Sequence, residues 1–147
     1  MSKKPKWDEC YTPKYIFDAL GVEFDLDPCS PEVGGVVPAQ HRYHLPGDGL
    51  SVNWFGFVWV NPPYSKPAPW VEKWLNHGNG LLMVLTTKSK WYKALWDDER
   101  TVTVNLHPPK FDVLNSTPRQ IAWPVNIWAI GEQAHSVLRN SNLGKIR

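Results

Sequence analysis

The stretch Phe55-Gly56-Phe57-Val58-Trp59-Val60-Asn61-Pro62-Pro63-Tyr64 joins a hydrophobic run to an abrupt polar end. The apolar residues 57–60 are typical of a buried strand. A residue before proline is driven to extended backbone, and two successive prolines stiffen the chain that follows. The stretch therefore predicts that the Asn61 carboxamide is held rigidly at the carboxyl end of a buried strand, which is where open α/β sheets bind ligands.

The composition around this stretch is that of one globular domain. The chain has 147 residues, of which 42% are hydrophobic and 20% are charged, and a chain of this size buries about two-thirds of its unfolded surface. We expect a single domain over residues 1–147, with residues 1–10 as a flexible basic arm. No apolar stretch approaches the roughly 18 residues that cross a membrane, and no secretory signal is recognised, so we expect a cytoplasmic protein. Cys10 and Cys29 form neither a disulfide framework nor a zinc site, and no metal is expected.

Helix and strand patterns alternate along the chain. Thr12 and Pro13 predict a helix start, with the Thr12 hydroxyl as N-cap and Pro13 as the first helical residue, and Gly21 predicts its end. Helices are expected over 13–20, 68–76, 89–96 and 132–139, and strands over 22–27, 57–60, 81–86, 101–106, 111–114 and 125–130, with a further short strand at 36–37 or 42–44. The alternation predicts an α/β fold with a mostly parallel sheet and helices on its faces. The strands at 111–114 and 125–130 are expected to pair as an antiparallel C-terminal edge.

The turn Asn61-Pro62-Pro63-Tyr64 is rich in hydrogen-bond acceptors. The Asn61 side-chain oxygen and the Pro62 carbonyl both accept, and neither proline has an N–H. Two fixed acceptors suit a planar –NH₂ group, and Tyr64 can lie against a flat ring. Holding both amine hydrogens out of the ring plane restores lone-pair density on a nitrogen that is otherwise a poor nucleophile, so that it can attack an activated methyl group.

The segment Val60-Asn61-Pro62-Pro63-Tyr64-Ser65 resembles the catalytic segment of amino-group methyltransferases that depend on S-adenosylmethionine. Three further segments occur in the order of the phage-type DNA N6-adenine methyltransferase family: residues 11–13, 24–30 and 48–50. The resemblance covers roughly residues 7 to 130. It implies a compact Rossmann-like methyltransferase fold, S-adenosylmethionine as the cofactor, DNA as the partner and, for a phage-encoded enzyme, the bacterial host cytoplasm as the location.

The same resemblance implies roles for individual residues. The catalytic residues are Asn61, Pro62, Pro63 and Tyr64. The cofactor-binding residues are Tyr11, Thr12, Pro13, Asp27, Pro28, Cys29 and Asp48. Asp27 is a better candidate than Asp25 because it lies nearer the strand end.

No separate domain for target recognition is present in the sequence, so we expect loops to read the DNA. The candidates for substrate contact are Lys66, Lys88, Lys110, Arg119 and Gln120. The net charge of +2 is too small to indicate a polyanion partner by itself. One or two of the nine tryptophans are candidates for stacking on a base, and the sequence does not choose among them. A homodimer would enlarge the DNA footprint of so small a domain.

Two alternative functions remain open at this point. The same turn suits another planar amine, such as an RNA base or a protein glutamine side chain. The chain also lacks a Gly-x-Gly turn directly after residues 24–28, where the only paired glycines, Gly34 and Gly35, come late. That difference favours a methyltransferase-like module that binds nucleic acid or cofactor without catalysis.

Overall fold

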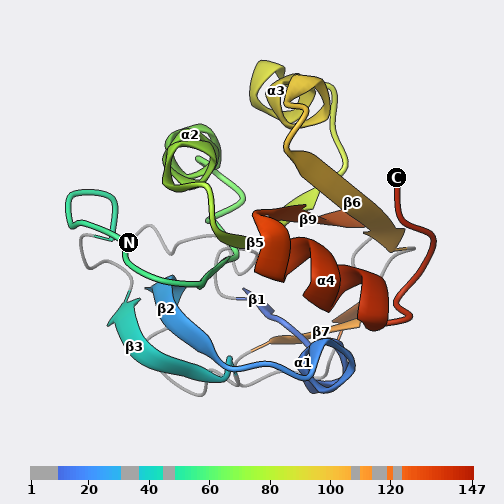
Figure 1. Cartoon of the computed structure of the whole chain (residues 1–147). Coiled ribbons are helices and arrows are strands. Elements are labelled where there is room, and N and C mark those ends of the chain that lie inside the picture. The colour runs from blue at the N-terminus through green and yellow to red at the C-terminus, as the bar shows by residue number, and fades with distance from the viewer. Residues whose placement is uncertain (1–9, 31–36, 45–48, 107–109, 114–118, 121–123) are drawn as a thin grey trace.

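The computed structural model describes residues 10–30, 37–44, 49–106, 110–113, 119–120 and 124–147 (Figure 1). The helices of this part are α1 (Lys14–Leu20), α2 (Ala68–His77), α3 (Lys90–Asp97) and α4 (Glu132–Asn140). Its strands are β1 (Cys10–Tyr11), β2 (Phe24–Ser30), β3 (Ala39–His44), β4 (Val58–Val60), β5 (Gly80–Leu85), β6 (Thr101–Leu106), β7 (Lys110–Val113), β8 (Arg119–Gln120) and β9 (Val125–Ile130). None of these helices is long and apolar enough to span a membrane.

The main sheet has six strands in the order β3-β2-β4-β5-β9-β6. The pairs β2–β3, β2–β4 and β4–β5 are parallel, whereas β9 runs antiparallel to both β5 and β6. The predicted α/β fold, with a mostly parallel sheet and an antiparallel C-terminal part, is confirmed. The arrangement is consistent with a Rossmann-like methyltransferase fold.

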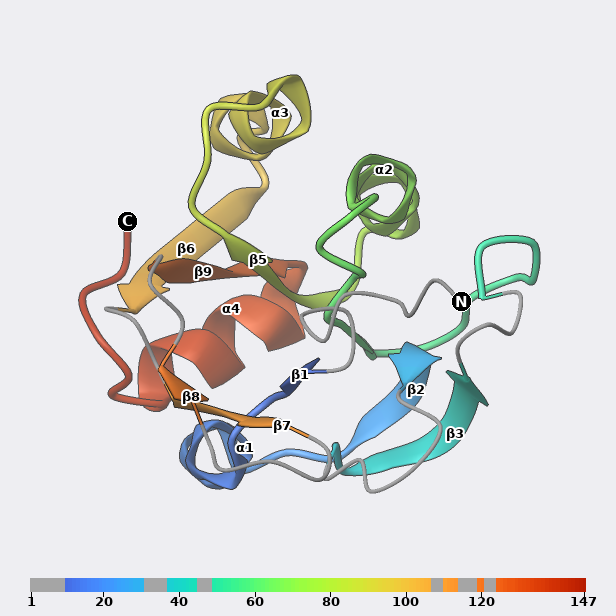
Figure 2. The ribbon, with the colours of Figure 1, turned by 180° about the vertical axis from the view of Figure 1, so that it is seen from behind.

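The predicted pairing of residues 111–114 with residues 125–130 is wrong. The backbone of β9 pairs at six positions with β5 and at six with β6, and all six of its residues are buried. A strand that is buried along its whole length belongs inside a sheet, with neighbours on both sides and helices on both faces. Strand β7 instead belongs to a separate three-stranded sheet of order β1-β7-β8, which lies near α1 (Figure 2).

Helices cover both faces of the main sheet (Figure 1). Alternate residues of β4 point into two separate apolar clusters: Trp59 packs with residues of α1 and α4, while Val58 and Val60 pack with residues of α2 and α3. Helix α2 begins just after a proline and ends at Gly78, whose φ of 74° is readily adopted by glycine. The three-residue strand β4 is thus fixed at the centre of the core, and the residues that follow it are positioned by that packing.

Two predicted boundaries change in the structure. Strand β2 does not end at Asp27 but continues through Pro28 to Ser30. A proline fits there because the register between β2 and β3 shifts between Asp27 and Ser30, so its missing N–H does not interrupt a regular ladder. Helix α1 begins one residue late, with Pro13 as its N-cap and no side-chain cap, so the predicted capping role of Thr12 is wrong.

Of the two places suggested for a further short strand, the second is observed. Strand β3 contains Arg42 and Tyr43 and pairs with β2 from Phe24 onward. The remaining predicted helices and strands of the main sheet lie within one or two residues of their observed bounds.

Candidate active site

The strand order creates a topological switch point at the carboxyl edge of the main sheet. The chain passes from β2 to β3 on one side of β2, and then crosses to β4 on its other side. Loops that leave two neighbouring strands in opposite directions leave room between them, and ligands of open α/β sheets bind there. Asp27 near the end of β2 and Asn61 just after β4 both lie at this switch point.

The Asn61 carboxamide is held by a residue 49 positions earlier in the chain. Its Nδ2 donates a hydrogen bond of 3.2 Å to Oγ1 of Thr12, whose side chain is only 4% exposed. The other amide atom, Oδ1, is buried and has no hydrogen-bond partner among the described residues. An unpaired buried acceptor costs free energy, and such atoms are uncommon in folded proteins. The amide therefore presents an acceptor whose bonding capacity is unused.

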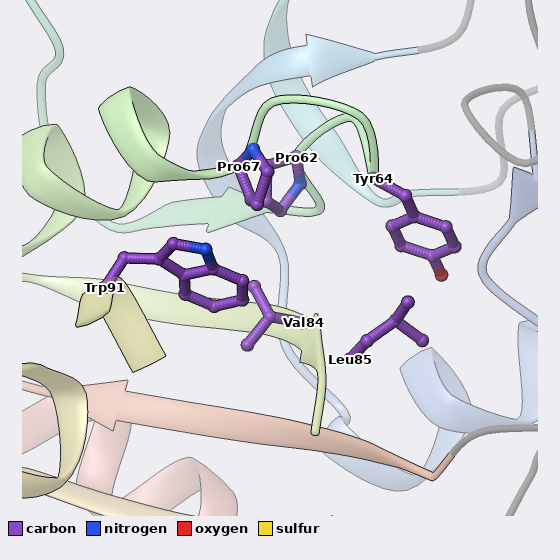
Figure 3. Close-up of a pocket in the computed structure, with 6 residues that line it drawn as sticks. All are labelled: Pro62, Tyr64, Pro67, Val84, Leu85 and Trp91. Carbon is purple, nitrogen blue, oxygen red and sulfur yellow. The ribbon is translucent and has the colours of Figure 1, made fainter. Parts of the chain in front are cut away.

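A small pocket adjoins the turn that follows Asn61. Figure 3 shows Trp91 and Tyr64 at opposite ends of it, with Val84 between them. The pocket holds about 30 Å³, room for about two water molecules. Its lining residues are Pro62, Tyr64, Pro67, Val84, Leu85 and Trp91. In this conformation the pocket is too small for a nucleobase.

The turn itself is compact. Pro62 is buried, and the backbone N–H of Lys66 donates to the Pro63 carbonyl at 3.3 Å. Tyr64 projects from this turn toward the pocket (Figure 3). All four residues predicted to be catalytic are therefore gathered at one corner of the sheet.

The predicted cofactor segments also come together at this edge. Asp27 is 1% exposed, and its Oδ1 accepts a hydrogen bond from the N–H of Cys29, which is buried. Gly49 packs so closely on β2 that a Cβ atom there would lie 2.0 Å from the Pro28 carbonyl oxygen. Asp48 lies outside the described residues, but its neighbour Gly49 is thus placed against the end of β2.

The two aspartates of β2 have different surroundings. The Asp25 carboxylate accepts a hydrogen bond of 2.7 Å from the backbone N–H of Phe57, just before β4. The Asp25 N–H donates in return to the Phe57 carbonyl at 2.8 Å. Asp25 therefore stabilises the entry into β4, which leaves Asp27 as the carboxylate nearer the site.

The residues expected to contact DNA occur in two groups. Lys66 and Lys88 are exposed and follow β4 and β5, at the carboxyl edge of the sheet. Lys110 pairs with Gln120 across β7 and β8, and Phe111 pairs with Arg119. Strand β7 also pairs with β1, where Tyr11 stands opposite Asp112. Arg119 and Gln120, which were expected in a DNA-reading loop, therefore lie in a short strand. The backbone of β8 is joined through β7 to the strand that leads into Thr12 and Pro13.

Sequence reasoning missed a buried polar cluster next to the site. Asn126 of β9 is 1% exposed, and its Oδ1 accepts hydrogen bonds from Thr86, Tyr92 and Asn105. Its Nδ2 donates to Thr103 at 2.9 Å. The cluster fixes both the segment that leaves β5 and helix α3, which carries Trp91. The sequence signal for this cluster was Asn126, the one polar residue in the otherwise apolar run 125–130. Within the described ranges, no three His, Cys, Asp or Glu side chains gather as metal ligands.

The family model for DNA N-6-adenine-methyltransferase (Dam) matches residues 1–106. The DNA N-6-adenine-methyltransferase of Haemophilus phage HP1 (strain HP1c1) is 29% identical over an alignment of 107 residues, which covers 62% of this chain and 58% of the phage protein. The match therefore spans little more than half of that relative, and no solved structure is a significant match. Strand β9 and helix α4 lie beyond the part that the family model covers.

Proposed function

Because the chain belongs to the DNA N-6-adenine-methyltransferase (Dam) family, we propose that it transfers a methyl group from S-adenosylmethionine to the exocyclic amine of adenine in DNA. The family expected from the resemblance is confirmed by the match to residues 1–106. The observation that carries the proposed reaction is the Asn61 amide. Its Oδ1 is a buried acceptor with no partner in the described part of the chain, at the carboxyl end of β4.

In the proposed reaction, Asn61 and Pro62 grip the amine. Asn61 Oδ1 accepts one amine hydrogen, and the Pro62 carbonyl accepts the other. Both acceptors stand on a turn whose backbone the prolines restrict, so the geometry is set before the substrate binds. Gripping both hydrogens draws the lone pair out of conjugation with the ring and leaves nitrogen nucleophilic. The acceptors also stabilise the positive charge that develops on nitrogen.

The residues around the end of β2 suit the proposed cofactor. The buried Asp27 carboxylate and the closely packed backbone at Gly49 and Pro28 lie together at the end of β2. We expect the cofactor to be held by Tyr11, Thr12, Pro13, Asp27, Pro28, Cys29 and Asp48. S-adenosylmethionine would supply a methyl group that its sulfonium already activates. The carbon–sulfur bond would break as the carbon–nitrogen bond forms, S-adenosylhomocysteine would leave, and the methylated nitrogen would release one proton to solvent.

The target base must leave the DNA stack to reach Asn61. Enzymes that modify a base flip it into a pocket, at a cost of a few kcal/mol for unstacking. In the proposed site, Tyr64 and Trp91 stand at the two ends of the pocket and are available to stack on the base (Figure 3). The Asn61 Oδ1 acceptor is itself buried in this conformation and is shielded from water. We expect this reaction in the cytoplasm of the bacterial host, where its DNA is found.

The test is product analysis with labelled S-adenosylmethionine and DNA, RNA or protein as acceptor. The wild-type protein is expected to label the N6 position of adenine in DNA. Asn61→Ala should lower the rate by about 100-fold or more, since removing one preorganised polar group from such a site costs that much. Asn76→Ala, on the exposed face of α2, is the matched control and should retain activity.

Three outcomes would contradict the proposal. Labelled methyl found only in RNA or in protein glutamine would show that the substrate is another amine and not adenine in DNA. Absence of cofactor binding in calorimetry would favour a non-catalytic binding module. A wild-type rate in a folded Asn61→Ala variant would remove the role assigned to the amide.

A further inference from the structure

We infer that Thr12 is a positioning residue, which holds the Asn61 carboxamide so that its oxygen faces the substrate amine. The inference rests on the proposed function and deepens it. The family resemblance assigned Thr12 to the cofactor instead. The geometry that points to the new role is the 3.2 Å bond from Asn61 Nδ2 to Thr12 Oγ1, together with the unused acceptor on the opposite side of the same amide.

The chemistry of a carboxamide makes its rotation matter. Its two ends have similar shapes but opposite hydrogen-bonding roles, because the oxygen accepts and the NH₂ donates. The Thr12 hydroxyl can satisfy either end, since a hydroxyl both donates and accepts. Only the observed rotation turns an acceptor toward the amine. The reversed rotation would set donor against donor, and an amide without the Thr12 bond would be free to rotate between the two.

The backbone around Thr12 makes it a rigid anchor. Thr12 directly follows β1, whose Tyr11 pairs with Asp112 of β7. It directly precedes Pro13, which is buried, serves as the N-cap of α1 and accepts a hydrogen bond from Ile16 N–H at 3.1 Å. The chain is therefore restrained on both sides of a side chain that is only 4% exposed.

The Thr12 hydroxyl does not cap the neighbouring helix α1. Thr and Ser hydroxyls near a helix start commonly bond the free backbone N–H groups there. In this structure α1 has no side-chain cap, and the Thr12 hydroxyl contacts Asn61, 49 residues away in sequence. The Thr12 hydroxyl therefore bonds the amide of the proposed catalytic turn and not the start of α1.

The test compares Thr12→Val, which keeps the shape but removes the hydroxyl, with Thr12→Ser, which keeps the hydroxyl. Methyl transfer to DNA and cofactor affinity by calorimetry are measured for both. Thr12→Val should lower kcat about tenfold or more, with cofactor Kd changed less than threefold. Thr12→Ser should restore kcat to within about threefold of wild type. In the Asn61→Ala background, Thr12→Val should cause no further loss.

A second readout needs no activity. In the ligand-free protein, the Asn61 side-chain NH₂ should show slow hydrogen exchange by NMR, and Thr12→Val should remove that protection while Thr12→Ser keeps it. Thr101→Val is the control, because it deletes a hydroxyl bonded to backbone carbonyls at Leu95 and Asp98, away from the turn. It should leave the Asn61 signal unchanged.

The outcomes separate this inference from the proposed function. If the wild-type protein methylates no adenine, the proposed function is wrong. The NMR comparison still tests whether Thr12 holds the Asn61 amide. If the wild-type protein is active and the Thr12→Val variant keeps its full kcat, the inference about Thr12 is wrong and the proposed function stands. A raised cofactor Kd with unchanged kcat at saturation would return Thr12 to the cofactor. A loss of kcat in the Ser variant as large as that in the Val variant would show that the hydroxyl alone does not hold the amide, and would overturn the inference.

Discussion

The Tyr92 hydroxyl donates a 2.9 Å hydrogen bond to Oδ1 of Asn126, and this bond joins helix α3 to strand β9. Tyr92 follows Trp91, which lines the pocket beside the candidate turn. Asn126 lies beyond the residues that the family model covers. A residue outside the matched segment thus fixes the helix that forms one end of the pocket.

Removal of Asn126 should therefore destabilise the fold. Asn126→Ala leaves the Tyr92 and Thr86 hydroxyls without their shared acceptor. Because buried groups then stay unpaired, we expect a loss of about 2–4 kcal/mol in the free energy of unfolding. Tyr92→Phe removes a single bond and should cost about 1 kcal/mol. Urea denaturation measures both, and a loss below about 0.5 kcal/mol for Asn126→Ala would contradict the importance of the cluster.

Gly56 should be sensitive to any side chain. Its φ is +66°, and a Cβ atom there would lie 2.2 Å from Asp25 Oδ2. Gly56→Ala combines backbone strain with this clash, so we expect a loss of about 3 kcal/mol. Gly21→Ala is the matched control, since Gly21 has a φ of +62° and nothing within 4 Å of the added Cβ. That variant should lose only about 1 kcal/mol. Equal losses in the two variants would show that Asp25 moves aside freely.

The ion pair between Asp98 and Arg100 should make stability depend on pH. The side-chain hydrogen bond from Arg100 is the main cause that lowers the pKa of Asp98 below its ordinary value. A lowered pKa in the folded state stabilises the protein above the ordinary pKa of about 3.9, and this contribution is lost as the pH falls through the lowered pKa. We expect Asp98→Asn to cost about 0.5 kcal/mol at pH 7, because Arg100 is largely exposed.

Urea denaturation of wild type and Asp98→Asn checks this prediction at pH 7 and at about pH 3. The difference between the two proteins should shrink at the lower pH. Asp97→Asn, which removes an exposed partner of Lys93, is the control and should change stability less at pH 7. A difference between wild type and Asp98→Asn that grows toward low pH would contradict the assigned cause.

Trp91 should contribute to substrate binding, whereas Trp96 on the same helix should not. Trp91 lines the pocket, and Trp96 is 50% exposed with its ring against Trp128. Stacking of a base on an aromatic ring is worth about 1–3 kcal/mol. Trp91→Ala is therefore expected to lower kcat/KM for DNA methylation about tenfold, while Trp96→Ala stays within about twofold. Steady-state kinetics with a short duplex measures both, and an unimpaired Trp91→Ala enzyme would place the base elsewhere.

Lys66 and Lys88 should bind DNA phosphates. Both are exposed and follow parallel strands at the carboxyl edge of the sheet. Each phosphate contact contributes about 0.9 to the slope of log K against log salt. Replacing either lysine by alanine should reduce the magnitude of that slope by about this amount. Lys14→Ala is the control, because Lys14 on α1 pairs with Asp18 at 3.1 Å. An unchanged slope in both test variants would exclude these two lysines from the DNA interface.

Several elements were predictable because their causes are local. Prolines 62 and 63 restrict the backbone whatever surrounds them, so the end of β4 was expected at Val60, where it is observed. The helix at 68–76 follows from apolar residues at helical spacing, and it forms within one residue of that range. Because Asn61 directly follows a buried strand of a mostly parallel sheet, it was also expected at the carboxyl edge of that sheet, where ligands bind.

Other features were not predictable because their causes are distant in sequence. Pro13 looked like the first residue of a helix capped by Thr12, but the Thr12 hydroxyl has Asn61 as its partner and the cap is absent. Strand β9 looked like a partner of residues 111–114, yet it pairs over its whole length with β5 on one side and β6 on the other, inside the main sheet. Neither the partner of the Thr12 hydroxyl nor the neighbours of β9 can be inferred from the residues next to Thr12 or Val125.

The sequence by itself determined the stiff acceptor-rich turn, the apolar strand that precedes it and the family to which the chain belongs, because backbone restriction and apolar patterning act between neighbouring residues. Only the tertiary structure decided which hydroxyl orients the Asn61 amide, which asparagine secures the helix beside the pocket and which of the tryptophans stands at its end. The physical reason is that a hydrogen bond or a packed ring depends on where the whole sheet places two segments, and strand order is set by burial over the entire domain.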